Sequence, residues 1–294
     1  MDNLLDLLEQ GFMQRAMIAG GLMGILGALL GSFVILRQLT FFSHTVGHAA
    51  IVGIAMGVLL GVNPDWLIAP CILLLGLGLQ YFTEKSDLNS EIILSTMLSG
   101  SIAVGIILIG FISGYRGSLF NFLFGDILAV NEWDIYKCLV LLLICALFLL
   151  LTLKEQVLLT LNQQMATVQG IPVRFYRYIF TILLSLVVAV AIKAIGILLV
   201  NAFLVIPPAS AKLLTRKFTS FLTLGTLLGC FSAIFGMLFS GLFNTSSGPT
   251  IVLVQVSIFL GALLLSKVWK FPLAEEKLFK GQRAKLDPKH SGPQ

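Results

Sequence analysis

The stretch FFSHTVGHAAIVGIAMGVLLGV, from Phe41 to Val62, is apolar and long enough to cross a lipid bilayer as a helix. Its first turns contain His44 and His48, two of the three histidines in the chain. Because an α-helix has about 3.6 residues per turn, a spacing of four places both imidazoles on one face. Neutral imidazole binds zinc and other first-row divalent metals, and ionisable side chains within a span usually line a pathway. The stretch therefore predicts a membrane helix with a metal-contact face.

Two other interpretations of the histidine pair compete with metal contact. Histidines near a helix end can simply meet water and lipid headgroups, and this interpretation stays open on the sequence alone. The zinc-protease pattern His-Glu-x-x-His is excluded, because Thr45 occupies the position of the glutamate that acts as general base.

Glycines recur at helical spacing in the first two apolar runs. A small residue every turn lets two membrane helices approach closely. We therefore expect packing faces on both helices, formed by Gly20, Gly24, Gly27 and Gly31 in the first and by Gly53, Gly57 and Gly61 in the second.

The composition is that of an integral membrane protein. Of the 294 residues, 57% are hydrophobic and 11% are charged, whereas soluble domains carry about 25% charged residues. The net charge of +5 does not indicate nucleic-acid binding, since the basic residues lie at the ends of apolar runs. The first ten residues contain three acids and no base, so we expect no cleaved signal peptide. The four cysteines include no C-x-x-C pair, which favours buried thiols over a disulfide or a zinc site.

Apolar runs of about 20 residues predict an all-α polytopic membrane protein with eight or nine transmembrane helices. Residues 1–271 form the predicted transmembrane domain. The charged segment 272–294 is a predicted flexible cytoplasmic tail. The expected spans cover residues 12–36, 43–62, 65–82, 91–113, 133–153, 175–192, 194–214, 219–241 and 249–267.

Three places interrupt the pattern of regular spans. Asn63-Pro64-Asp65 predicts a tight turn. The mixed stretch Ser118 to Leu128 predicts a short interfacial or re-entrant piece. Pro207-Pro208 removes two backbone donors, which predicts a broken helix whose freed carbonyls face protein or a pore rather than lipid.

The distribution of Lys and Arg predicts the orientation of the chain. With nine crossings and the N-terminus outside, fifteen of these residues are cytoplasmic and four lie outside, in agreement with the positive-inside rule. The C-terminus and the loop between the fifth and sixth spans are then cytoplasmic. In that loop, Ala166 and Gly170 lie four residues apart on a short helix-like piece that Pro172 ends. Such a piece suits a groove on a partner, although an ordinary solvated loop is the alternative.

In four stretches, in order, the chain resembles the membrane permease subunit of bacterial manganese, zinc and iron ABC importers, the ABC-3 family. The likeness extends to about Lys267. The segment SHTVGHA (43–49) is similar to the family pattern G-D-x-x-x-H-A. Ala166 with Gly170 matches the family pattern A-x-x-x-G. The segment GILLVNAFLVIPPASAKLLT (196–215) is similar to the family pattern G-x-L-L-V-x-A-L-L-x-x-P-A-A-T-A-R. The last span opens with the family-like run SGPTIVLV (247–254).

The resemblance implies an ABC importer permease fold and assigns roles to individual residues. The family's acid and histidine contact the metal along the pore, which transfers to His48 directly and to His44 by position only, because the family has aspartate there. Imidazole in place of carboxylate shifts the preference from Mn²⁺ toward Zn²⁺ or Fe²⁺. Ala166 and Gly170 are implied to couple the chain to an ATPase. A second departure is Pro207-Pro208, where the family has Pro-Ala.

The implied function is that of the channel-forming subunit of an ATP-driven importer in the bacterial inner membrane, with manganese, zinc or iron as cargo and no permanently bound cofactor. The implied partners are an ABC ATPase subunit, an extracytoplasmic metal-binding protein and a second copy of the chain. The chain has no G-x-x-x-x-G-K-[ST] loop, so ATP hydrolysis is expected from the partner, and the chain itself is not expected to be an enzyme. A permease for a metal chelate and a proton-driven secondary transporter are the alternatives.

Overall fold

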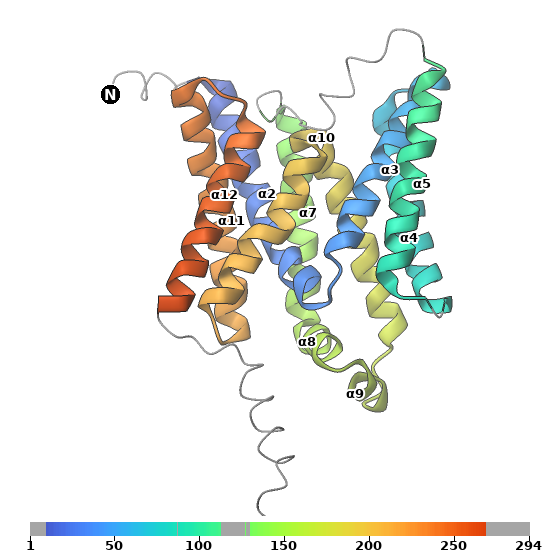
Figure 1. Cartoon of the computed structure of the whole chain (residues 1–294), viewed down its shortest axis with the longest axis vertical. Coiled ribbons are helices and arrows are strands. Elements are labelled where there is room, and N and C mark those ends of the chain that lie inside the picture. Colours follow the sequence, from blue (N-terminus) through green and yellow to red (C-terminus); the bar gives the residue numbers. More distant parts are fainter. Residues whose placement is uncertain (1–9, 87, 113–126, 128–129, 269–294) are drawn as a thin grey trace, which may run out of the picture.

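The computed structural model describes residues 10–86, 88–112, 127 and 130–268. Every long element in this part of the chain is an α-helix, which confirms the predicted all-α class (Figure 1). Eight of the helices in these residues are long and apolar enough to cross a membrane. They are α2 (Gly11–Leu36), α3 (Thr40–Leu59), α4 (Pro64–Lys85), α5 (Ser90–Gly110), α7 (Glu132–Leu151), α10 (Val173–Leu214), α11 (Phe218–Phe243) and α12 (Ser247–Val268), and the shorter α8 (Leu153–Leu161) and α9 (Gln163–Val168) lie between α7 and α10.

Helix α10 contains two of the predicted spans, 175–192 and 194–214, joined by a sharp bend. Gly196 is the one residue inside this 42-residue element with non-helical angles, φ 78° and ψ 163°. Only glycine adopts that region readily, because a Cβ would collide with the backbone. Figure 1 shows α10 rising from the end of the molecule that carries α9 and folding back toward the same end. We call residues 173–195 its first arm and residues 197–214 its second arm.

The predicted break at Pro207 and Pro208 is wrong, because both prolines are buried within the regular second arm. Without their N–H groups, the carbonyls of Phe203 and Leu204 lose their usual donors. Those carbonyls lie against α2, where a Cβ on Gly31 would collide with the Leu204 carbonyl. The freed carbonyls therefore face protein, as expected, and close cover by α2 lets the helix continue without a break.

The glycine faces pack as predicted, with one exception. On α2, Gly24 lies against Gly229 of α11 so closely that neither position has room for a Cβ. On α3, Gly53 and Gly57 pack against the first turns of α4. The prediction for Gly61 is wrong: no atom of the described residues lies within 4 Å of its Cβ position, and its φ of 66° follows the end of α3 at Leu59. Its role is to end the helix rather than to pack.

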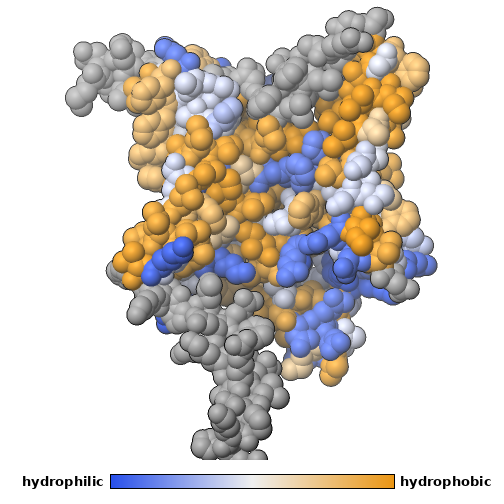
Figure 2. Space-filling model, viewed as in Figure 1, coloured by the Kyte–Doolittle hydropathy of each residue, from blue (hydrophilic) through white to orange (hydrophobic). Residues whose placement is uncertain are grey.

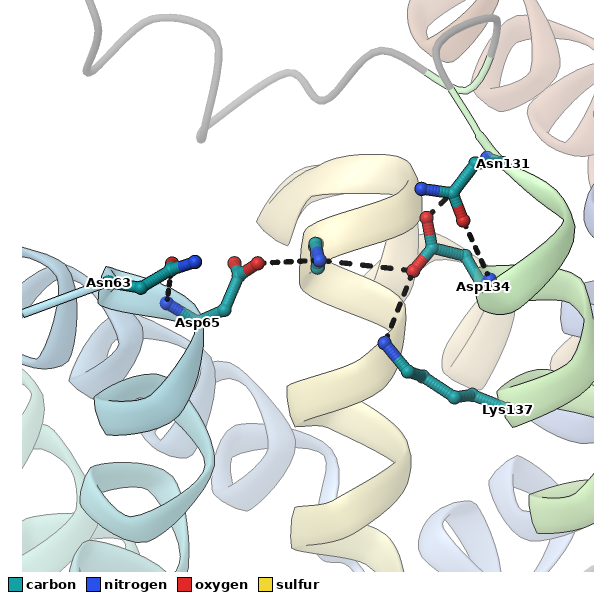
Figure 3. Close-up of polar contacts among 6 residues, drawn as sticks. Asn63, Asp65, Asn131, Asp134 and Lys137 are labelled. Atoms are coloured by element: carbon teal, nitrogen blue, oxygen red, sulfur yellow. Dashed lines mark hydrogen bonds and ion pairs between the residues drawn. The ribbon is translucent and has the colours of Figure 1, made fainter.

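Polar contacts tie the beginnings of α4 and α7 to α10, close to the bend. Asp65 in α4 and Asp134 in α7 face each other across α10 (Figure 3). The Lys193 Nζ atom lies 2.6 Å from Asp65 Oδ2 and 3.9 Å from Asp134 Oδ1. The Oδ1 atoms of Asn63 and Asn131 accept hydrogen bonds from the backbone N–H groups of the same two aspartates. The sequence Asn63-Pro64-Asp65 is therefore the capped start of a helix, and Lys193 holds the first arm between α4 and α7.

Figure 2 shows how polarity is distributed over one face of the molecule. Apolar side chains cover its flanks, and hydrophilic side chains gather near its middle and toward the end where α8 and α9 lie. The predicted tail 272–294 and nearly all of the predicted piece 118–128 lie outside the described residues. The division of the chain at residue 271 therefore stays a prediction.

Replacement of Gly31 by alanine is expected to destabilise the fold. The added Cβ has no space beside the Leu204 carbonyl, so α2 and α10 must separate, at a cost of about 1–3 kcal/mol typical of overpacking. Thermal unfolding of the purified protein in detergent measures the effect. Gly100→Ala is the matched control, since nothing lies within 4 Å of the Cβ position there. Equal melting temperatures for the two variants would contradict the packing argument.

Candidate metal-contact site

Helix α3 places His44 and His48 on one face, as their spacing predicts. Their ring centroids are 4.8 Å apart and their planes meet at 81°. The second arm of α10 adds a third side chain, since the Asn201 Nδ2 atom lies 2.9 Å from His44 Nδ1. We call His44, His48 and Asn201 the histidine–asparagine cluster. Two helices from distant parts of the sequence thus bring two imidazoles and one amide together.

Two atoms of the cluster are buried without a hydrogen-bond partner among the described residues. They are His48 Nδ1 and Asn201 Oδ1. Buried polar atoms in folded proteins are nearly always paired with protein, water or a bound ion. An imidazole nitrogen and an amide oxygen are both established ligands of divalent metals. The unpaired atoms therefore fit a cation that arrives from outside the chain.

The surroundings of the cluster are apolar and closely packed. Gly47, between the two histidines, faces Ile192 and Ile197 on the two sides of the bend in α10. Both histidine side chains are half-buried, and His44 contacts α10 directly. These contacts are made with protein rather than with lipid headgroups; that the histidines line a pathway stays a prediction.

The donor set of the cluster is small. Among the described residues there is no group of three or more His, Cys, Asp or Glu side chains that could hold a metal ion. Structural metal sites usually close four strong ligands around the ion. Two imidazoles and an amide would hold a cation less tightly than such a closed set of ligands.

Asn201 was missed at the sequence level, although a signal for it exists. It is the only polar residue between Gly196 and Pro207, within the quoted run GILLVNAFLVIPP. A single amide in such a run predicts an inward-facing side chain with a polar partner. The partner could not be identified, because His44 lies 157 positions earlier.

The two predicted coupling residues lie in a separate part of the molecule, the α8–α9 lobe (Leu153–Val168). The Ala166 side chain is fully buried within this chain, whereas docking in a groove of a partner requires it on the surface; its coupling role stays a prediction. The exposed apolar residues of α9 are instead Met165 and Val168, which are 54% and 86% exposed. Gly170 is exposed and has a φ of 77°, which fits the expected turn.

Comparison with known proteins gave consistent matches. The family model described as the ABC 3 transport family matches residues 9–266. The manganese transport system membrane protein MntC of Listeria innocua is 34% identical over 260 residues, which cover 88% of this chain and 92% of that protein. The high-affinity zinc uptake system membrane protein ZnuB of Haemophilus influenzae is 28% identical over 84% of this chain and 95% of its own length. The solved structure of PsaBC from Streptococcus pneumoniae in complex with Fab is similar with a TM-score of 0.79 and 28% identity, over 96% of this chain and 99% of that chain.

Replacement of Asn201 by leucine is expected to weaken equilibrium binding of Zn²⁺ by roughly tenfold, because loss of a side chain that orients a metal ligand typically costs 10–100-fold. Isothermal titration of the purified chain measures the change. Gln80→Leu is the matched control, since Gln80 is a buried amide on α4 whose hydrogen bonds go to Glu84 and Thr181. An unchanged affinity for Zn²⁺ in the Asn201 variant would show that Asn201 does not belong to the metal site.

Proposed function

The chain belongs to the ABC 3 transport family, and on this premise we propose that it is the channel-forming subunit of an ATP-driven importer for a divalent transition metal ion, manganese or zinc. The observation that carries the proposal is the histidine–asparagine cluster, a metal-compatible group inside a helical membrane protein. The names of the relatives MntC and ZnuB support manganese or zinc as the transported ion, since one is a manganese and the other a zinc transport protein.

The energy for transport comes from a partner. This chain has no phosphate-binding loop, so a separate ABC ATPase subunit hydrolyses ATP. The remaining partners are an extracytoplasmic metal-binding protein that delivers the ion and a second copy of the chain. Proton-driven transport has less support, since Asp65, Glu84, Glu91 and Asp134 all lie in the first or last turn of their helices, whereas proton relays use carboxylates within the span.

The orientation follows the charge distribution. Among the described residues, Lys and Arg concentrate on the side that carries the α8–α9 lobe and the end of α12, so this side is cytoplasmic in a bacterial inner membrane. The beginnings of α4 and α7, joined by Lys193, then face outward. The lobe lies where an ATPase can reach it.

The cluster binds the ion during its passage between these two sides. His48 Nδ1 and Asn201 Oδ1 supply lone pairs that have no other partner in the part of the chain that the structure describes, and Asn201 holds His44 in place. A bound ion favours one state of the transporter only if the cluster binds it more tightly in that state. Because Asn201 follows the bend in α10, movement of the second arm against α3 changes the distance between the ligands and thus the affinity.

Replacement of His48 by alanine is expected to abolish uptake, because it removes one imidazole and one of the two unpaired atoms. The complex of this chain with its ATPase, reconstituted in liposomes, is tested for ATP-dependent uptake of Mn²⁺ and Zn²⁺, which should fall to the level without ATP. The ATPase should still co-purify. His290→Ala is the control, as it removes the third histidine of the chain. Uptake at the wild-type rate in the His48 variant would exclude the proposed role of this residue.

Replacement of Val168 by glutamate is expected to release the ATPase. If this exposed side chain docks in a groove, an unpaired charge there costs several kcal/mol. Co-purification from membranes measures the loss. Leu88→Glu is the matched control, because Leu88 is an exposed leucine between α4 and α5 on the same side. If only the control loses the ATPase, the coupling surface lies at the α4–α5 corner instead.

A further inference from the structure

Arg37 occupies the sharp corner between α2 and α3. Its neighbour Gln38 has a φ of 57°, and among the described residues only Asn244 shares a positive φ without being glycine. The Leu39 N–H donates to the Val34 carbonyl at 2.8 Å, and the Gln38 N–H donates to Ile35 at 3.2 Å. These bonds close the corner in a defined geometry, typical of a helix C-terminus. The corner fixes the position of Arg37, and α3 begins three residues after it, at Thr40.

The Arg37 guanidinium connects the corner to helix α8. Its Nε donates to Thr160 Oγ1 at 3.1 Å, and its Nη2 donates to the Gln156 carbonyl at 3.3 Å and to Gln156 Oε1. Gln156 is fully buried. The same guanidinium lies over the ring of Phe180 in α10, 4.5 Å from its centroid, and over the ring of Phe33 in α2 at 5.6 Å. One side chain thus contacts α2, α8 and α10.

The partners of Arg37 are all neutral. No ion pair of Arg37 occurs among the described residues, and the nearby Glu84 pairs with Arg177 instead, at 3.7 Å. Burial lowers the pKa of Arg37 to about 10, with repulsion from Arg177 as a second cause, so the group stays charged at neutral pH. A half-buried cation without a carboxylate depends on these acceptors and ring faces to offset the cost of its partial desolvation.

Helix α8 has few other connections to the membrane helices. It follows α7 across Thr152, whose φ of −113° and ψ of 21° interrupt the helix. Because α7 and α8 are separate helices, the position of α8 relative to α2 also depends on side-chain contacts. Arg37 supplies such a contact from the corner that begins the helix of His44 and His48.

We propose that Arg37 is the positioning residue that transmits movement of the α8–α9 lobe to helix α3, and so links ATP hydrolysis to the state of the histidine–asparagine cluster. This inference rests on the proposed function. A push on the lobe moves Gln156 and Thr160, the guanidinium follows its acceptors, and the corner carries the displacement into the first turns of α3. Lysine cannot replace arginine here, because one ammonium does not reproduce the planar fork that reaches two residues and stacks on two rings.

The test measures coupling rather than activity alone. The complex of the chain and its ATPase is reconstituted in liposomes, and ATP-dependent Mn²⁺ uptake and ATP hydrolysis are recorded on the same sample. For Arg37→Lys, we expect the ratio of ions transported to ATP hydrolysed to fall about fivefold or more, the lower range of typical coupling between sites, while the ATPase remains bound. Arg174→Lys is the matched control, because Arg174 is exposed on the same side, and its ratio should equal that of the wild type.

A second pair of variants covers the case in which Arg37→Lys does not fold. Gln156→Leu and Thr160→Val remove the acceptors and leave Arg37 in place, and each should lower the same ratio. If Arg37 acts through these residues, combining Gln156→Leu with Arg37→Lys should lower the ratio little further. A purely structural role would instead reduce the amount of assembled complex and leave the ratio of the remainder unchanged, which would overturn the inference.

Failure of the inference and failure of the proposed function give different results. If the wild-type complex takes up neither Mn²⁺ nor Zn²⁺ in an ATP-dependent manner, the proposed function is wrong and coupling cannot be the role of Arg37. If the wild type transports and all three variants keep its ratio of transport to hydrolysis, the function stands and the assignment of Arg37 is wrong.

Discussion

The absence of water in the hydrocarbon core of a bilayer is the constraint on which this structure depends. Backbone N–H and C=O groups in lipid must find partners within the protein, so a spanning chain forms helices and bends only where protein covers the bend. The second arm of α10 illustrates the rule, because the carbonyls that Pro207 and Pro208 leave free lie against the glycines of α2. The regular second arm of α10 therefore requires glycine at position 31 of α2.

The same constraint explains where the cluster lies. The bend at Gly196 interrupts α10 beside α3, and Asn201 follows it within the next turn and a half of helix. A polar amide and two imidazoles are costly against lipid but compatible with an internal pathway. The bend that folds α10 back on itself therefore also brings Asn201 to His44.

The structure is held differently at its two ends. Near the beginnings of α4 and α7, Lys193 forms partly exposed ion pairs with two aspartates, which are weak and exchange readily with solvent. At the other end, Arg37 is half-buried among neutral acceptors and aromatic rings. Partly exposed ion pairs suit a contact that opens, whereas a half-buried contact with several residues suits one that moves as a unit.

Much of this architecture could be predicted from the sequence. Hydrophobic runs, glycine spacing and the histidine pair depend on local chemistry and helical periodicity, which a single segment carries by itself. The sequence by itself determined the helical membrane fold, the face shared by His44 and His48, and the family patterns around them. Tertiary structure decided the contact of Asn201 with His44, the burial of Ala166 and the regular helix through Pro207 and Pro208. Each of these depends on a neighbour that is distant along the chain, and local periodicity contains no information about which helix that neighbour belongs to.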